Sequence, residues 1–194
     1  MEHFEETLSI ICEAVRSIHA DEFDKLKEEC IRTLDANNKI IASGLGKNVP
    51  ICEKFVGSLT SLGMSAAFMH TNSAVHGDLG LVRDGDLVIV LTKSGETSES
   101  IYLVKLLQKR NCKIWLLSFS RESTLYNEVP NRLIIELRHE GDPWNILPNH
   151  STVLNLIVLQ ELAMQIAQER SVSLETLWLN HPGGNIGEIL SGGV

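Results

Sequence analysis

The cysteine patterns and the repeats that would place a chain in several other classes of protein are absent from this sequence. It has four cysteines, Cys12, Cys30, Cys52 and Cys112, and no CxxC pair. A disulfide or zinc framework is therefore not indicated, and because each cysteine falls within an apolar stretch we expect buried free thiols. No internal repeat and no low-complexity tract interrupts the 194 residues. The chain is predicted to fold as one domain over residues 1–194.

Long hydrophobic runs and an excess of positive charge are also missing. No apolar run approaches the roughly 18 residues of a membrane-spanning helix, and the first residues, "MEHFEETLSI", carry acids where a signal peptide needs a basic region. We therefore expect no membrane partner and a cytoplasmic location. The net charge of −8 argues against a nucleic-acid partner. An anionic small ligand would have to be held locally by a lysine, helix N-termini and backbone amides.

Hydrophobic spacing predicts alternating helices and strands. Apolar residues recur every three or four positions near the N-terminus, which predicts an N-terminal helix over about 4–34. Short, continuously apolar strands then alternate with helices across a core of about 39–170, a pattern typical of a parallel sheet covered on both faces. We predict a three-layer α/β/α sandwich with a mostly parallel, five-stranded sheet. The expected strands are 39–43, 65–70, 87–92, 113–118 and 132–137, and the main helices are about 49–62, 98–110 and 151–170.

Three polar motifs follow predicted strands, where ligands bind in such sheets. They are "SGLGKN" at 43–48, "KSGETSES" at 93–100 and "RHEGDPWN" at 138–145. In the first, Ser43, Gly44, Lys47 and Asn48 stand between a strand and a helix, where free amides and the helix dipole favour an anion. A plain turn explains the glycines equally well. The motif lacks the third glycine of a dinucleotide fingerprint and the spacing of an ATP-binding P-loop, so we expect neither a nicotinamide dinucleotide nor a P-loop nucleotide here.

The second motif is suited to a phosphate. Thr97 and Ser98 are good helix N-cap residues, and together with Ser94 they offer hydroxyls while the turn at Gly95 offers amides. Two acids, Glu96 and Glu99, lie in the same stretch. Acids in a first helical turn usually interact with the helix dipole, but one that points toward the far end of the ligand could transfer a proton.

Four motifs in order, "GLGKN", "HGDLG", "SGETSE" and "HPGGNIG", resemble the sugar isomerase (SIS) domain and most closely the arabinose 5-phosphate isomerases. The resemblance runs from about residue 39 to residue 190. It implies an SIS fold in which a phosphorylated aldose and ketose interconvert through an enediol without a required cofactor. The expected reaction is D-arabinose 5-phosphate to D-ribulose 5-phosphate.

The resemblance also implies which residues line the active site. They are Lys47, His76, Glu99, Glu140 and His181. Isomerisation needs a base for the proton next to the carbonyl, a group that opens the sugar ring and a cation for the enediolate. We expect Glu140 to be the base and Lys47 to counter the phosphate or the enediolate, and either histidine could open the ring. No metal site is predicted, because no ligand spacing of a known kind is present.

Four residues depart from the family pattern. Asn48 replaces the usual serine after the lysine of the first motif, and Lys93 adds a charge where many members have asparagine. Trp144 and His150 enlarge a stretch that is usually small, close to the proposed site. The sequence ends at Val194 without the paired CBS modules that many members carry, so we expect no regulation through them. These changes bear on the identity of the sugar.

Two other functions compete with this interpretation. A non-catalytic sugar-phosphate sensor would need the phosphate loop but not Glu140 or His181. Another SIS isomerase is disfavoured by "HGDLG" and "HPGG". The C-terminal site segment, about 173–190, has more apolar residues than a free tail needs, which predicts a homo-oligomer. The resemblance implies a dimer of dimers in which His181 reaches a neighbour's site.

Overall fold

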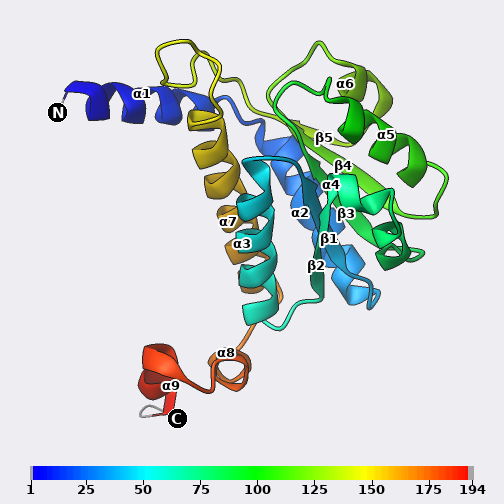
Figure 1. Ribbon diagram of the computed structural model, residues 1–194. Coiled ribbons are helices and arrows are strands. Elements are labelled where there is room, and N and C mark those ends of the chain that lie inside the picture. Colours follow the sequence, from blue (N-terminus) through cyan, green and yellow to red (C-terminus); the bar gives the residue numbers. More distant parts are fainter. Residues whose placement is uncertain (1, 192–194) are drawn as a thin grey trace.

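The computed structural model describes residues 2–191, apart from the side chains of Glu2, Ile186, Leu190 and Ser191. It is an α/β structure whose strands and helices alternate over most of the chain (Figure 1). The elements in chain order are α1 (Glu2–Arg16), α2 (Ala20–Asp35), β1 (Ile40–Gly44), α3 (Asn48–Ser61), β2 (Ala66–His70), α4 (Thr71–Ala74), the 3₁₀ helix η1 (Asp78–Leu81), β3 (Leu87–Leu91), α5 (Ser98–Leu107), β4 (Lys113–Ser118), α6 (Thr124–Glu128), β5 (Arg132–Ile134), α7 (His150–Glu169), α8 (Leu174–Asn180) and α9 (Gly184–Ser191).

The five strands form one parallel sheet in the order β2-β1-β3-β4-β5. The predicted fold class is therefore confirmed. Because the chain leaves β1 toward β2 on one side and later adds β3, β4 and β5 on the other, the order reverses between β1 and β3. Loops that leave these two strands at their carboxyl ends diverge there, which opens a place for a ligand.

Both faces of the sheet are buried, and this explains the uninterrupted apolar strands. Ile40, Leu87 and Ile89 pack with the helices α2, α3 and α7 on one face. Their neighbours in the chain, Ile41 and Val88, pack with α5 on the other face. Successive side chains of a strand point to opposite faces, so a sheet covered twice needs an apolar residue at every position.

The N-terminal region differs from the prediction. It forms two helices, α1 and α2, instead of a single helix over 4–34. The chain bends at Ser17, whose hydroxyl donates to the Ala14 carbonyl at 2.7 Å and accepts from the Glu136 amide at 2.9 Å. This tertiary contact with the end of the sheet stops α1, which then projects away from the body of the molecule (Figure 1).

Other predicted details also changed. The last strand has three residues, Arg132–Ile134, where six were expected, because the Glu136 amide turns to Ser17. Only Cys30 and Cys52 are buried, whereas Cys12 is exposed and Cys112 is half-buried. All four thiols are free, and burial raises the pKa of Cys30 and, to about 12, that of Cys52. Among the helices described, none is long and apolar enough to cross a membrane.

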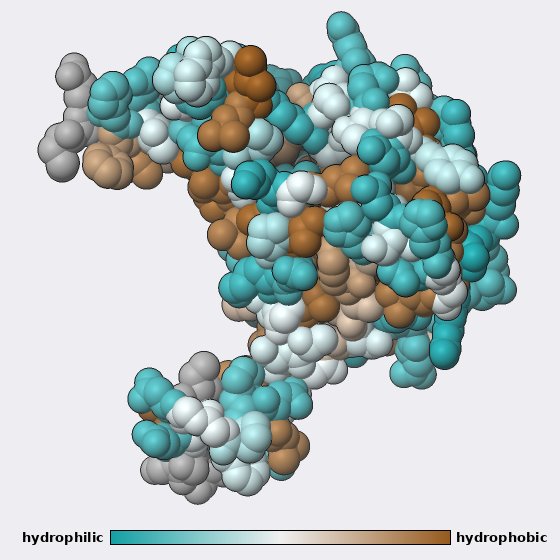
Figure 2. All heavy atoms as spheres, viewed as in Figure 1, coloured by the Kyte–Doolittle hydropathy of each residue, from teal (hydrophilic) through white to brown (hydrophobic). Residues whose placement is uncertain are grey.

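The C-terminal helices α8 and α9 lie apart from the sheet, below the C-terminal end of α3 (Figure 1). Asn180 ties them to the body by donating to the Ser61 carbonyl at 3.2 Å. Opposite them, across a hollow outline, lies α1 (Figure 2). Exposed apolar side chains occur on α1, on the loop before α7, on α7 itself and on the C-terminal helices, and we call them the apolar surface: Phe4, Leu8, Trp144, Ile146, Leu147, Val153, Ile157, Met164, Leu174, Leu179 and Ile189.

Candidate active site

Three loops meet at the carboxyl edge of the sheet, as the motifs predicted. The loop after β3 reaches the loop after β5 through an ion pair in which Lys93 Nζ lies 2.8 Å from Glu140 Oε1. The loop after β1 reaches the start of α7, because Asn155 Nδ2 donates to Asn48 Oδ1 at 3.0 Å. Residues distant in the sequence therefore surround one region near the switch point between β1 and β3.

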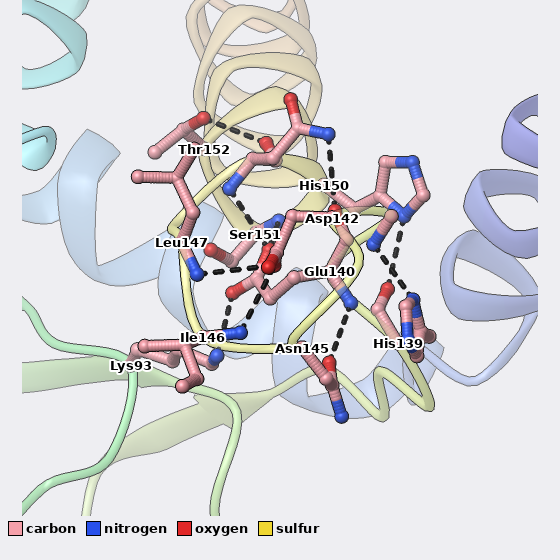
Figure 3. Close-up of polar contacts among 12 residues, drawn as sticks. Lys93, His139, Glu140, Asp142, Asn145, Ile146, Leu147, His150, Ser151 and Thr152 are labelled. Carbon is pink, nitrogen blue, oxygen red and sulfur yellow. Dashed lines mark hydrogen bonds and ion pairs between the residues drawn. The ribbon is translucent and has the colours of Figure 1, made fainter.

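Glu140 is the centre of this region and is almost completely buried, with 1% of its surface exposed. Its Oε2 accepts hydrogen bonds from the amides of Asn149 at 3.0 Å and Ser151 at 2.9 Å, at the N-terminus of α7 (Figure 3). Its own amide donates to Asn145 Oδ1 at 2.8 Å. A carboxylate at a helix N-terminus is stabilised by free amides and by the helix dipole. Glu140 is thus not a solvated loop acid.

The charge of Glu140 is set by opposing effects. Burial raises its pKa, but the ammonium of Lys93, the Ser151 hydroxyl and the amides of Ser151 and Asn149 lower it. The net result is a pKa below the ordinary value of a glutamate. Glu140 is therefore a carboxylate at neutral pH, which is the form a general base needs.

The loop that carries Glu140 is held by its own polar groups. Asp142 accepts hydrogen bonds from the amides of Trp144, Ile146 and Leu147 at 2.9–3.0 Å. These bonds lower the pKa of Asp142 although burial acts in the opposite direction. This apolar and proline-containing stretch forms no helix or strand, and the Asp142 carboxylate provides hydrogen-bond acceptors for three of its backbone amides.

His150 fixes the same loop to the N-terminal helix. One ring nitrogen lies 2.9 Å from the His139 carbonyl and the other lies 3.3 Å from the Thr7 hydroxyl. A side chain at Gly141, which has φ +84°, would lie 2.3 Å from the His150 ring. The large residue that departs from the family pattern is thus accommodated by a glycine with a left-handed backbone.

The loop after β3 has the features predicted for a phosphate site. Thr97 occupies the N-cap position of α5. Ser94 and Ser98 are exposed, and the Ser94 hydroxyl accepts from the Glu96 amide at 3.2 Å. Gly95 has φ +70°, and a Cβ there would lie 2.2 Å from the Ser123 hydroxyl, so only glycine fits this turn. Exposed hydroxyls at a helix N-terminus suit an anion.

The two acids of this loop do different things. Glu96 turns to α6, where it accepts from the Thr124 amide at 2.5 Å and from the Thr124 hydroxyl at 2.9 Å. Glu99 is exposed, and its pKa is lowered by a hydrogen bond from its own amide and by the Ser98 hydroxyl. Both arrangements are those of helix-terminus acids. A role for either acid in the site stays a prediction.

The loop after β1 supplies the remaining predicted contacts. Ser43 is buried and its hydroxyl lies 3.1 Å from the Thr71 hydroxyl. A Cβ at Gly44 would lie 2.9 Å from the Cβ of Asn48, so glycine lets α3 start close to β1. Lys47 is exposed at the N-cap position of α3. Its ammonium is therefore accessible to an anion near this edge.

The two predicted histidines lie in different places. His76 is exposed between α4 and η1, in the segment that leaves the carboxyl end of β2. His181 ends α8, where a ring nitrogen lies 2.8 Å from the Leu177 carbonyl. It lines a groove of about 610 Å³ with Ser61 and Met164, toward the C-terminal ends of α3 and α7. Glu140 lies at the opposite end, about 20 Å away along α3.

Sequence reasoning missed the partners of Glu140. Lys93 was noted only as a departure from a family pattern, and the amides of Asn149 and Ser151 carry no signal in the residue types. The available signal was an acid that follows a short apolar strand and precedes the start of a helix by ten residues, because such an acid can accept hydrogen bonds from the free amides at the helix N-terminus.

The SIS domain family matches residues 33–163, which is more than half of the chain. The chain belongs to this family, and the predicted resemblance is confirmed. It is related to the arabinose 5-phosphate isomerases named KdsD. The KdsD of Salmonella typhi is 30% identical over 161 residues, 83% of this chain and 49% of the relative. That of Pseudomonas aeruginosa PAO1 is 28% identical over 184 residues, 95% of this chain and 56% of the relative.

A solved structure is also similar over nearly the whole chain. The protein c3406 of Escherichia coli CFT073, in complex with arabinose 5-phosphate, superposes with a TM-score of 0.84 at 28% sequence identity. The match covers 93% of this chain and 95% of that one. The chain spans about half the length of the curated relatives it matches.

Proposed function

We propose that this chain is an aldose–ketose isomerase that acts on a sugar phosphate and converts D-arabinose 5-phosphate to D-ribulose 5-phosphate. The observation that carries the proposal is the buried carboxylate of Glu140, held ionised at a helix N-terminus and next to a loop suited to phosphate. The names of the KdsD relatives and the arabinose 5-phosphate bound to c3406 support the substrate. A cytoplasmic location is part of the same proposal.

Each step of an enediol reaction has a candidate group. The exposed hydroxyls of Ser94 and Ser98 hold the phosphate at the start of α5. Glu140 removes the proton from C2 through Oε1, because Oε2 is already engaged by two amides. The exposed Lys47 counters the negative charge of the phosphate or of the enediolate oxygens. His76, His181 or Glu99 opens the sugar ring or returns a proton to it.

Isomerisation in heavy water tests this function. A base that lifts the C2 proton exchanges it with solvent, so deuterium should appear in the product at the position that receives the proton. The measurement is NMR of the product formed by purified protein from a panel of sugar phosphates. Conversion with full retention of the original hydrogen would indicate a hydride shift and would remove Glu140 from its role.

We further propose that the site is completed by a second copy of the chain in a homo-oligomer, with a dimer of dimers as the expected assembly. Two observations support this proposal. His181 lies at the far end of α3 from Glu140 of the same chain. The apolar surface flanks the hollow between α1 and the C-terminal helices (Figure 2). A neighbouring chain that covers this surface could bring its His181 to the site of the first.

A further inference from the structure

Lys93 is a cation in the centre of the site where the resembling sequences usually have asparagine. It lies after Thr92, the residue that follows β3, and precedes Ser94, the first residue of the phosphate loop. Its Nζ lies 2.8 Å from Glu140 Oε1 (Figure 3). Lys93 therefore touches both parts of the site, the loop for the phosphate through its backbone and the base through its ammonium.

The two oxygens of Glu140 are not equivalent. Oε2 accepts from two amides at the start of α7, which hold it against that helix end. Oε1 is buried and has no aligned hydrogen bond from any residue described. Its neighbour is the Lys93 ammonium. Since Oε1 is the oxygen left to take a proton, its ion pair with Lys93 competes with proton transfer to it.

Lys93 is free to move where Glu140 is not. The Lys93 side chain is 40% exposed, and that of Glu140 is 1% exposed. A lysine stem has four rotatable bonds and an ammonium that binds as a point charge. A phosphate dianion that arrives at Ser94 would carry more negative charge than the carboxylate and would compete for the same ammonium.

We propose that Lys93 is a positioning residue that covers the base in the free protein and is drawn off it by the phosphate of the substrate. The proposal rests on the proposed function and adds a source of specificity to it. A phosphorylated sugar uncovers Oε1 as it binds, and the ammonium then neutralises part of the phosphate charge. An unphosphorylated sugar leaves Oε1 covered and is not isomerised. No bond is made or broken in this step, because only an ion pair is exchanged.

The first test observes the carboxyl group directly. The Glu140 side-chain carbon is followed by ¹³C NMR during a pH titration, and its signal is assigned by its loss in Glu140→Gln. In Lys93→Met the titration should move to higher pH, because burial then acts against fewer stabilising groups. Lys93→Arg keeps the positive charge and should titrate close to the wild type. The matched control is Lys105→Met, which removes an equal charge from the exposed last turn of α5 and should change nothing.

Sulfate is the probe for displacement, because it remains a tetrahedral dianion at the acidic pH where Glu140 titrates, whereas inorganic phosphate is then only a monoanion. Added to the wild-type protein, it should move the Glu140 titration to higher pH relative to an equal ionic strength of chloride. In Lys93→Met it should have no such effect. If the Glu140 titration is the same in wild type, in Lys93→Met and with sulfate, the proposal is wrong.

The second test uses catalysis and a variant close to the family pattern. Lys93→Asn should lose part of the preference for the phosphorylated sugar. We expect the ratio of kcat/KM for arabinose 5-phosphate to that for arabinose to fall about tenfold or more, as for the loss of one strong ionic contact. The acid limb of kcat/KM should also move to higher pH, whereas Lys105→Met should keep both. An unchanged ratio with an unchanged acid limb would overturn the role of Lys93.

The two proposals fail in distinguishable ways. If wild-type protein isomerises no sugar phosphate, the proposed function is wrong, and the NMR titration still decides whether Lys93 controls Glu140. If Glu140→Gln abolishes isomerisation while the Lys93 variants behave as wild type, the proposed function stands and the proposal that Lys93 covers Glu140 Oε1 is wrong.

Discussion

The loop around Glu140 and the segment around His181 are built in opposite ways. In the Glu140 loop, buried carboxylates of the loop itself bind the amides: Asp142 takes three of them, and Glu140 takes two at the start of α7. The His181 segment lies outside the body of the chain (Figure 1) and exposes apolar residues such as Leu174 and Leu179. The first region is held by hydrogen bonds within its own chain, and the second exposes the apolar residues that we propose a neighbouring chain covers.

From this contrast we expect the Glu140 half of the proposed site to be independent of assembly and the His181 half to depend on it. A buried, hydrogen-bonded carboxylate keeps its place in an isolated chain, because its partners are local. In the proposed assembly, a histidine at the end of a short helix, about 20 Å from the base along α3, would reach a base only in a neighbouring chain. The predictions below separate the two halves, in descending order of the change we expect.

Replacement of Glu140 by glutamine should give the largest loss of activity, and it tests the half of the proposed site that is held within one chain. The amide keeps the shape of the side chain but cannot accept a proton, so kcat should fall by about 10²- to 10⁴-fold. Steady-state kinetics with arabinose 5-phosphate measures the effect, and circular dichroism of the variant checks the fold. A variant with near wild-type kcat would show that another group is the base.

Mixing of two inactive variants tests the half that depends on a neighbour. Lys47→Ala and His181→Ala should each be nearly inactive alone. Co-refolded hybrids should regain a fraction of wild-type activity, because some sites then contain neither lesion. If mass measurement shows hybrids but no activity returns, His181 either serves its own chain or has no catalytic role.

A charge on the apolar surface should weaken assembly. Ile157→Glu places a carboxylate on the exposed face of α7, where we expect a neighbouring chain to pack. Analytical ultracentrifugation should then show smaller species, and activity should fall with them. The matched control is Tyr102→Glu, an exposed aromatic position on α5 at the other face of the sheet, which should keep the wild-type mass. Equal masses for wild type and Ile157→Glu would place the interface elsewhere.

Removal of the Ser94 hydroxyl should have a moderate effect on binding alone. Ser94→Ala deletes one ground-state contact with a charged phosphate, worth about 1.5 to 3 kcal/mol, so KM should rise by roughly tenfold or more. Inhibition by free phosphate should weaken in parallel. The phosphate loop would have to be reassigned if KM and phosphate inhibition both stayed unchanged.

The pH dependence of stability should give the smallest signal. The pKa of Glu140 in the folded chain is lower than the ordinary value of about 4.3 for a glutamate. Its ionised form therefore contributes stability above that ordinary value, and the contribution is lost as the pH falls through the folded value. Urea unfolding at a series of acidic pH values should show a shallower loss of unfolding free energy in Glu140→Gln. Parallel curves for the two proteins would contradict the lowered pKa.

Much of the fold was predictable because it follows from local patterns. Continuous apolar strands indicated a parallel sheet buried on both faces, and Ser43, Ser94 and Glu140 were correctly expected at its carboxyl edge. The N-terminal helix was predicted too long, since the break at Ser17 depends on a hydrogen bond from Glu136, more than a hundred residues away. Helical periodicity continues through such a break and cannot reveal it.

The order of residues alone was enough to establish the class of fold, the position of the motifs at strand ends and the family to which the chain belongs. Those properties depend on side-chain period and on neighbours in the sequence. Tertiary packing was needed to bury Glu140, to bind its Oε2 at the start of α7 and to bring Lys93 over its Oε1. It also separated His181 from Glu140 within one chain. Burial and ion pairing depend on which distant segments are packed together, and that packing sets the local dielectric and hence the charge of each group.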